Sequence, residues 1–270
     1  MKPGMRAVVP SPATAAAEGV APAAAANTQP TLTPPAIGAL VVNALPARGI
    51  LGRVVLRGTP PPEQVISMDP SCGKIHVGKA TTRFFAVAAN GGLADVFVSV
   101  TELPRGQWEP PAKPVEIRQR GCEYLPYVSA AQAGQIIRVF NDDPLMHNVH
   151  PAPTVEGNEE QNRVQINAGA PPLDHSFPKP ELFLRFKCDV HPWMFAYMSI
   201  VEHPFFGVSA ADGQFALPEP PPGDYTLRFI HRKAGEKFVA VSVRPGRRVV
   251  VNVILNISDP LKHEAVVTEE

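Results

Sequence analysis

A cysteine, a histidine and a methionine follow one another at three-residue intervals: Cys188, His191 and Met194. This spacing places a thiol, an imidazole and a thioether on one short loop. Upstream, His147 offers a second imidazole. Two imidazoles, a thiolate and a weak thioether are the donors of a mononuclear blue-copper site, because sulfur donors select Cu(I) and imidazole also suits copper. The four residues therefore predict a copper site.

The same residues allow two simpler interpretations. Zinc also takes cysteine and histidine donors, but it has little use for a thioether, so copper is the better prediction. A lone cysteine such as Cys188 is usually a small buried hydrophobe. The joint pattern, with a histidine on an upstream segment, favours metal binding over that interpretation.

The stretch before this loop is predicted to be a β-strand that carries the cysteine. Alternate residues of Glu181–Cys188 are apolar, so the two-residue period of a strand places them on one face and Arg185 and Lys187 on the other. The apolar face consists of Leu182, Leu184, Phe186 and Cys188. Cys188 is therefore expected to end the strand on the core side.

From residue 48 onward the whole chain is predicted to be β. Short alternating runs recur between turns rich in Pro, Gly, Asn and Asp, and no window of a dozen residues has a helical period. The predicted strands are Gly49–Gly58, Thr82–Ala88, Ala94–Thr101, Gln135–Phe140, Glu181–Cys188, Met194–Val201, Tyr225–Ile230, Lys237–Val243 and Arg248–Leu255. Many short strands at this spacing predict sandwiches rather than a parallel α/β sheet.

At the donor residues the sequence resembles a known family. The segment Cys188-Asp-Val-His191-Pro-Trp-Met194 resembles the ligand loop of the amicyanin-type cupredoxins, and Met146–His150 is similar to their upstream ligand segment. The resemblance covers about a third of the chain, residues 115–203. It implies a cupredoxin Greek-key β-sandwich that holds one type 1 copper ion through His147, Cys188, His191 and Met194.

The resemblance also assigns roles to neighbouring residues. Asn148 would tie the two ligand segments together through its backbone and side chain and would tune the thiolate. His150 receives no ligand role. Met198 is the second candidate for the axial donor, should the Met194 side chain point away.

An electron carrier of this kind needs a place where electrons leave. His191 is the expected exit, because Pro192, Trp193 and Phe195 surround it with apolar groups that could form a docking patch. We therefore expect an unknown redox protein to dock near His191 and Trp193.

The segment after the copper motif has a second signature. Asp212-Gly213 predicts a tight hairpin, and Pro222-Gly223 precedes a strand. This pattern resembles carboxypeptidase regulatory-like modules, which are small transthyretin-like β-sandwiches, and Ile50–Gly58 resembles the opening strand of such a module. The predicted organisation is a disordered Ala/Pro-rich leader (1–40), a cupredoxin-like domain with an N-terminal β extension (41–203), the regulatory-like module (204–258) and a tail (259–270). Ile50–Gly58 is also expected to pack with the module across the copper-binding insertion.

The remaining cysteines bear on the compartment. Cys72 and Cys122 either form a disulfide in an oxidising compartment or are two unpaired buried thiols, and the sequence leaves both open. Copper ligation and a disulfide would favour a periplasmic or extracytoplasmic setting. The leader adds little to that expectation, because Pro10, Pro12 and Glu18 interrupt its apolar stretch.

Composition excludes several other classes of protein. Lys and Arg number 25 and Asp and Glu number 25, so the chain lacks the basic excess of a nucleic-acid binder. No apolar run is long enough to span a membrane. The sequence has no His-x-His pair for a second copper centre, no phosphate loop and no zinc-protease motif, so no enzyme is predicted. A one-electron carrier is the expected function, with a copper-binding or scaffolding protein that has no redox partner as the alternative.

Overall fold

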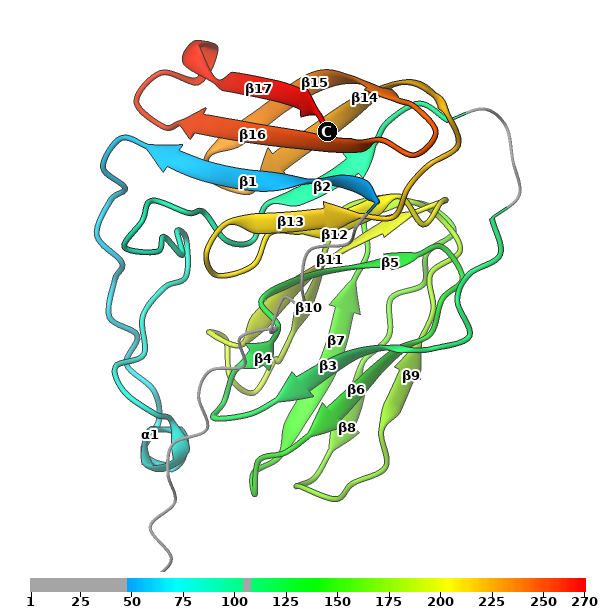
Figure 1. The fold of residues 1–270 in the computed structure, drawn as a ribbon. Helices are drawn as coiled ribbons and strands as arrows, with labels where there is room; N and C mark the ends of the chain where they lie inside the picture. Colours follow the sequence, from blue (N-terminus) through cyan, green and yellow to red (C-terminus); the bar gives the residue numbers. More distant parts are fainter. Residues whose placement is uncertain (1–47, 104–107) are drawn as a thin grey trace, which may run out of the picture. The chain divides into compact units, whose positions relative to one another are not determined.

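The computed structural model describes residues 48–103 and 108–270, and this part of the chain is almost entirely β (Figure 1). It contains seventeen strands, one six-residue helix, α1 (Pro70–Ile75), and one 3-10 turn, η1 (Pro260–Lys262). The prediction of an all-β chain is confirmed. The predicted leader, residues 1–40, lies outside the described residues. No helix in the described ranges is long and apolar enough to cross a membrane.

Two four-stranded sheets form what we call the first sandwich. One sheet has the order β13 (Gln214–Leu217), β1 (Gly49–Arg57), β16 (Arg248–Asn256) and β17 (Glu264–Glu269). The other has the order β12 (Phe206–Val208), β2 (Phe97–Val100), β14 (Gly223–His231) and β15 (Gly235–Val243). All neighbours are antiparallel except β1 and β16.

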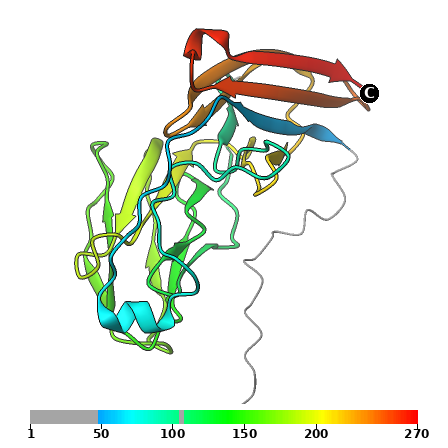
Figure 2. The same cartoon turned by 90° about the vertical axis from the view of Figure 1, so that its left-hand side faces the viewer.

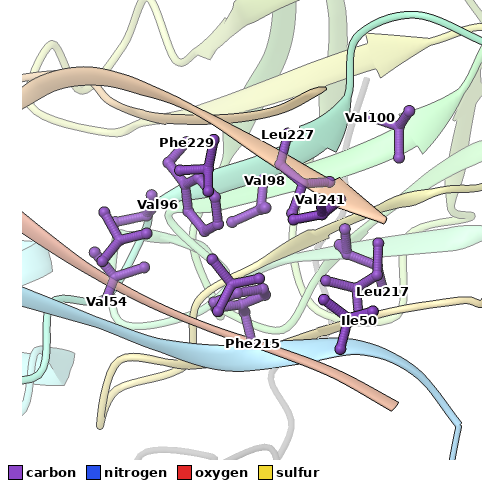
Figure 3. Packing of buried hydrophobic residues seen from close by; sticks show 14 of the residues in the cluster. Ile50, Val54, Val96, Val98, Val100, Phe215, Leu217, Leu227, Phe229 and Val241 are labelled. Atoms are coloured by element: carbon purple, nitrogen blue, oxygen red, sulfur yellow. The ribbon is translucent and has the colours of Figure 1, made fainter. Parts of the chain in front are cut away.

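The core of the first sandwich lies between these two sheets (Figure 3). Phe229 of β14 and Phe215 of β13 meet edge to face, with ring centroids 5.2 Å apart. Val54 of β1 and Val98 of β2 are completely buried beside them. Residues from both ends of the chain therefore fill one core, since burial of apolar side chains drives the two sheets together.

Strand pairing in the first sandwich differs from the predicted domain boundaries. Ile50–Gly58 does share a sheet with the C-terminal strands, as expected: β1 pairs with β13 and β16. However, β2 also belongs to this sandwich and pairs with β12 and β14, so the sheets do not divide at residue 203. Residues 259–270 are not a tail, because β17 extends the sheet along β16.

A second sandwich contains the predicted copper motif. One sheet has the order β5 (Val128–Gln132), β11 (Phe195–Val201), β10 (Glu181–Lys187), β7 (His147–Ala152) and β8 (Arg163–Gln165). The other has the order β4 (Tyr124–Leu125), β3 (Val115–Gln119), β6 (Ile137–Asn141) and β9 (Leu173–His175). The neighbours β5 and β11, and likewise β3 and β6, run parallel. Their facing apolar residues form a separate core that includes Ile117, Phe186 and Met198.

The strand that carries Cys188 is less regular than predicted. Its pairing with β11 shifts register between Glu181 and Leu184, and Phe183 has a φ of 56°. This β-bulge turns Leu182 outward, where it is 36% exposed, and leaves Leu184 and Phe186 buried. The period-two pattern thus holds from Leu184 to Cys188 but not at Leu182.

Between β1 and β2 the chain leaves the first sandwich as a long segment, residues 59–88, which we call the strap. Figure 2 shows it running down from β1 to α1 and returning toward β2. The predicted strand Thr82–Ala88 is wrong: its polar backbone groups find local partners, with Phe85 N–H donating to the Glu63 carboxylate over 2.8 Å. A Cys72–Cys122 disulfide joins α1 to the second sandwich.

Replacement of a core aromatic tests the packing of the first sandwich. Phe229→Ala should lower the free energy of unfolding by about 3–5 kcal/mol, because it leaves a cavity between the sheets. Phe238→Ala is the matched control, since Phe238 lies on neighbouring β15 and is 50% exposed; it should cost less than about 1 kcal/mol. Denaturant unfolding of both variants gives the comparison. Equal losses would contradict the assignment of this core.

Asp95 should make the free energy of unfolding fall as the pH rises through the pKa of its carboxyl group. Burial raises the pKa of this carboxyl to about 6, although Arg83 acts in the opposite direction. A group with a raised folded-state pKa costs stability above that pKa, and the cost disappears below its unfolded-state value. Asp95→Asn should therefore raise the free energy of unfolding at pH 7 by about 3 kcal/mol and make little difference near pH 4. A gain that is independent of pH would contradict this cause.

Candidate metal centre

The structure brings His147, Cys188 and His191 to one point. His147 begins β7, Cys188 directly follows β10, and His191 lies in the turn between β10 and β11. The Nδ1 atoms of His147 and His191 are 3.0 Å apart, and Cys188 Sγ lies 3.7 Å from His191 Nδ1. All three side chains are buried. Because β7 and β10 are antiparallel neighbours, residues 41 positions apart meet at one end of the sheet.

These three donors fit a metal ion of the predicted kind. Nitrogen ligands lie at about 2.0 Å and sulfur ligands at about 2.3 Å from a d-block cation such as zinc. Two donors at these distances from one cation lie about 3 to 4 Å from each other. The observed separations, 3.0 Å between the two Nδ1 atoms and 3.7 Å between Sγ and His191 Nδ1, lie in that range. The rings of His147 and His191 stand at 70° to each other and do not stack, so both Nδ1 atoms can face a common centre. In the described ranges, every cluster of three metal-binding groups includes His147 or His191.

Two main-chain hydrogen bonds shape the loop from Cys188 to Met194. Cys188 N–H donates to the Met194 carbonyl over 3.0 Å, and Met194 N–H donates to the His191 carbonyl over 2.8 Å. The loop is thus a closed turn that holds its thiol and imidazole on the same side. The Met194 side chain is 1% exposed and belongs to the same apolar cluster as Cys188.

Asn148 makes the contacts expected of a residue that ties the two ligand segments. Its backbone N–H points at Cys188 Sγ at 3.5 Å, and its side-chain Oδ1 accepts from Asp189 N–H at 2.7 Å. The hydroxyl of Tyr124 adds a second tie, donating to the carbonyls of Asn148 and Lys187 at 2.7 and 3.2 Å. The spacing between thiol and histidine is therefore fixed from both sides.

The electrostatics of the cluster favour a thiolate. Burial by itself would raise the pKa of the Cys188 thiol, but His147 and the backbone N–H of Asn148 outweigh burial and lower the pKa. Burial lowers the pKa of His191, and the neighbouring His147 lowers it further. Burial opposes protonation of His147 as well, yet Asp143 and Cys188 raise the pKa of His147 overall. An anionic sulfur beside a neutral His191 is the state that a cation needs.

Asp143 contacts the donor cluster, and the sequence analysis did not identify it. Its carboxylate accepts from His147 Nε2 at 2.9 Å and from Cys122 N–H at 2.8 Å. An acceptor on the outer nitrogen of a ligand histidine fixes which nitrogen carries the proton and so directs Nδ1 inward. Asp143 stands four residues before His147. That spacing brings two side chains together on a helix, but no helix is predicted here, so the sequence did not indicate the contact.

The surroundings of His191 differ from the predicted docking patch. His191 is only 7% exposed, because the strap covers it, and its Nε2 lies 3.5 Å from the carboxylate of Asp69. Trp193 packs on the same ring, with centroids 5.4 Å apart, and its buried indole N–H has no hydrogen-bond partner among residues 48–103 and 108–270. The Nε2 edge of His191, the expected electron exit, is therefore covered.

Trp193 and Met194 also line a cavity of about 290 Å³. Tyr124, Phe195 and strap residues including Met68 form its other walls. Trp193 is half-buried at a partly enclosed wall, and docking of a redox partner near it stays a prediction.

Two further donors in this region have other partners. Met198 lies on β11 with its sulfur accepting from the Ser129 hydroxyl at 3.5 Å. Both ring nitrogens of His150 face carboxylates, those of Asp189 at 2.6 Å and Glu160 at 2.5 Å. His150 thus stands outside the donor cluster, as the resemblance implied.

Comparison with known proteins finds no family model that matches the chain, and no curated protein matches it. Solved structures do show similarity over part of it. A purple cupredoxin from Nitrosopumilus maritimus is 20% identical, with 32% of this chain aligned to 98% of that one at a TM-score of 0.27. Amicyanin from Paracoccus versutus is 18% identical, with 38% aligned to 96% at a TM-score of 0.29.

A copper-containing nitrite reductase from Thermus scotoductus is 16% identical, and 55% of this chain aligns with 28% of that protein at a TM-score of 0.29. The chain thus spans less than a third of the reductase and nearly the whole of each small copper protein. With TM-scores of 0.27 to 0.29, these similarities carry no argument about the site, which is argued from the positions of its own side chains.

Proposed function

We propose that the second sandwich is a cupredoxin that binds one type 1 copper ion, and that the protein is a one-electron carrier rather than an enzyme. The observation that carries this proposal is the convergence of His147 Nδ1, His191 Nδ1 and Cys188 Sγ in a buried cluster. Two imidazoles and a thiolate in this arrangement are the equatorial donors of blue-copper sites. Copper bound there would supply the Cu(II)/Cu(I) couple.

We assign the axial position to Met194. Its side chain is buried on the loop that closes around the site, and its backbone bonds to Cys188 and His191 hold it beside them. Met198 has a hydroxyl partner in Ser129, which supports its role as a core residue. The thioether is a weak donor to Cu(II), and the axial ligand of such a site tunes its reduction potential.

The chain's own residues would keep the site nearly unchanged during electron transfer. Asn148 holds the thiolate, Asp143 holds His147, and the closed loop holds His191 and Met194. Burial of all four donors excludes water, which would otherwise reorganise when the charge changes. A packed β-scaffold resists movement, so the barrier to gaining or losing an electron stays low.

The setting that we propose is periplasmic or extracytoplasmic, since the Cys72–Cys122 disulfide persists in oxidising compartments. The partner is a redox protein that meets the surface around Trp193. For the first sandwich we propose a carboxypeptidase regulatory-like module with a structural role. Its Asp212-Gly213 turn supports this: Gly213 has a φ of 83°, and a Cβ there would lie 2.3 Å from the Val54 carbonyl.

Colour is the first test of the site. Cu(II) added to the metal-free protein should produce an intense blue or green colour, because a thiolate bound to Cu(II) gives a strong charge-transfer band. Cys188→Ser should abolish the colour and leave the β-sheet circular dichroism signal unchanged, since serine is nearly the same size. Met198→Leu is the matched control and should retain the colour. A correctly folded wild-type protein that binds Cu(II) without colour would rule out the type 1 assignment.

Voltammetry separates an electron carrier from a copper-binding scaffold. The carrier predicts a reversible one-electron wave whose midpoint rises in Met194→Leu, because loss of the thioether makes the environment of Cu(II) less favourable. A scaffold that merely holds copper predicts an irreversible wave or loss of metal on reduction. Retention of one copper per chain through repeated cycles, measured by metal analysis, is the companion readout.

A further inference from the structure

The imidazole edge of His191 that faces away from the other donors is covered by the carboxylate of Asp69. Its Nε2 lies 3.5 Å from Asp69 Oδ2, and the residue is 7% exposed although it lies in a loop. Asp69 belongs to the strap, which comes from the chain of the first sandwich. The cover is therefore brought in from a part of the sequence more than 100 residues away.

Asp69 is held in place by the turn that it begins. Its carboxylate accepts from the N–H groups of Ser71 and Cys72 at 2.7 and 3.1 Å, so it caps α1. Two contacts then attach α1 to the second sandwich. Cys72 is bonded to Cys122, and His76 Nδ1 lies 2.9 Å from the Gly121 carbonyl.

The Cys72–Cys122 disulfide connects the two segments whose carboxylates face His147 and His191. Asp143 faces His147 and accepts from Cys122 N–H, and Asp69 faces His191 and accepts from Cys72 N–H. Each half-cystine is thus bound by the carboxylate that faces one of the two histidines. Both sulfur atoms lie within 4.8 Å of a His191 ring nitrogen. Since both cysteines are completely buried, the disulfide is shielded from thiol exchange.

We propose that Asp69 is a positioning residue for His191, and that the strap is a fixed cap that keeps solvent, ligands and redox partners off the Nε2 edge of that ring. The proposal rests on the proposed function for its consequence in electron transfer. At 3.5 Å the Asp69 carboxylate acts on Nε2 through its charge, which favours the proton on Nε2 and the Nδ1 lone pair toward the donor cluster. A redox partner consequently meets the strap and Trp193 instead of the imidazole edge.

Chemical modification of the metal-free, full-length protein tests the cap directly. Diethyl pyrocarbonate acylates accessible neutral imidazole, and peptide mapping by mass spectrometry locates the product. His191 should be protected in the wild-type protein and modified at least as fast as partly exposed His76 in Asp69→Ala. Asp259→Ala is the matched control, because Asp259 caps η1 in the same way and should leave His191 protected. Modification of His191 in the wild type, or protection in Asp69→Ala, would overturn the cap.

A second variant separates positioning from structure. Asparagine is as good a helix cap as aspartate, so Asp69→Asn should keep the strap in place and His191 protected. It removes the negative charge facing Nε2, so the reduction potential of the copper-loaded protein should rise. Asp259→Asn should leave the potential unchanged. An unchanged potential in Asp69→Asn would reduce Asp69 to a structural cap and contradict the positioning role.

Electron self-exchange, followed by NMR line broadening of mixed Cu(I) and Cu(II) protein, tests the barrier to partners. Asp69→Ala should speed it by about one order of magnitude, within the range over which encounter rates vary among variants of one interface. An unchanged rate would show that the cap does not limit access. If the protein fails to form a coloured copper site, the proposed function fails, while the modification experiment on metal-free protein still decides whether the cap exists.

Discussion

Burial of two imidazoles and a thiol at one point is the constraint on which the rest of this structure depends. Each of these groups loses water on burial, and none is stable there without a partner. Every polar atom that faces away from the cluster must therefore meet a fixed group. Asp143 and Asp69 serve the outer nitrogens of His147 and His191, and the Asn148 N–H serves the sulfur. These surrounding contacts are therefore as necessary to the buried cluster as its own three side chains.

The β-sandwich meets this constraint by making distant residues neighbours. His147 begins β7 and Cys188 follows β10, and the antiparallel pairing of these strands sets Lys187 opposite His150. Sheet register is sharply specified where one face is buried, since a slip of one residue would move every side chain to the other face. The bulge near Glu181 adjusts the far end of β10 and leaves the end at Cys188 in register. Precision at the site thus comes from sheet pairing and not from loop rigidity alone.

Local patterns in the sequence were sufficient to predict that His147, Cys188 and His191 lie together, and to predict the strands with clear alternation. The Cys188–Met194 loop is seven residues long, so its chemistry can be recognised without knowledge of the fold. Asp143 and Asp69 escaped recognition because their roles depend on which histidine they meet. The same limit explains the strap: Thr82–Ala88 alternates as a strand would, but it forms only an isolated bridge at Val87, and Glu63 accepts the Phe85 N–H instead. The strand β17 was missed because its residues, Glu264–Glu269, are polar as well as apolar and only β16 gives them a partner.

The order of the strands gives the first sandwich a physical part in the metal centre. The second sandwich is inserted between β2 and β12, and these two strands pair with each other, so both ends of the insertion are anchored side by side. The strap likewise leaves from β1 and returns into β2, two strands whose side chains share one core. Anchoring both ends of a long segment reduces the entropy lost when its middle is held at a fixed place. The disulfide then fastens that middle to Cys122 beside the histidines. A sandwich that contributes no side chain to the donor cluster can in this way stabilise the group that covers His191, so the two sandwiches act together at this site.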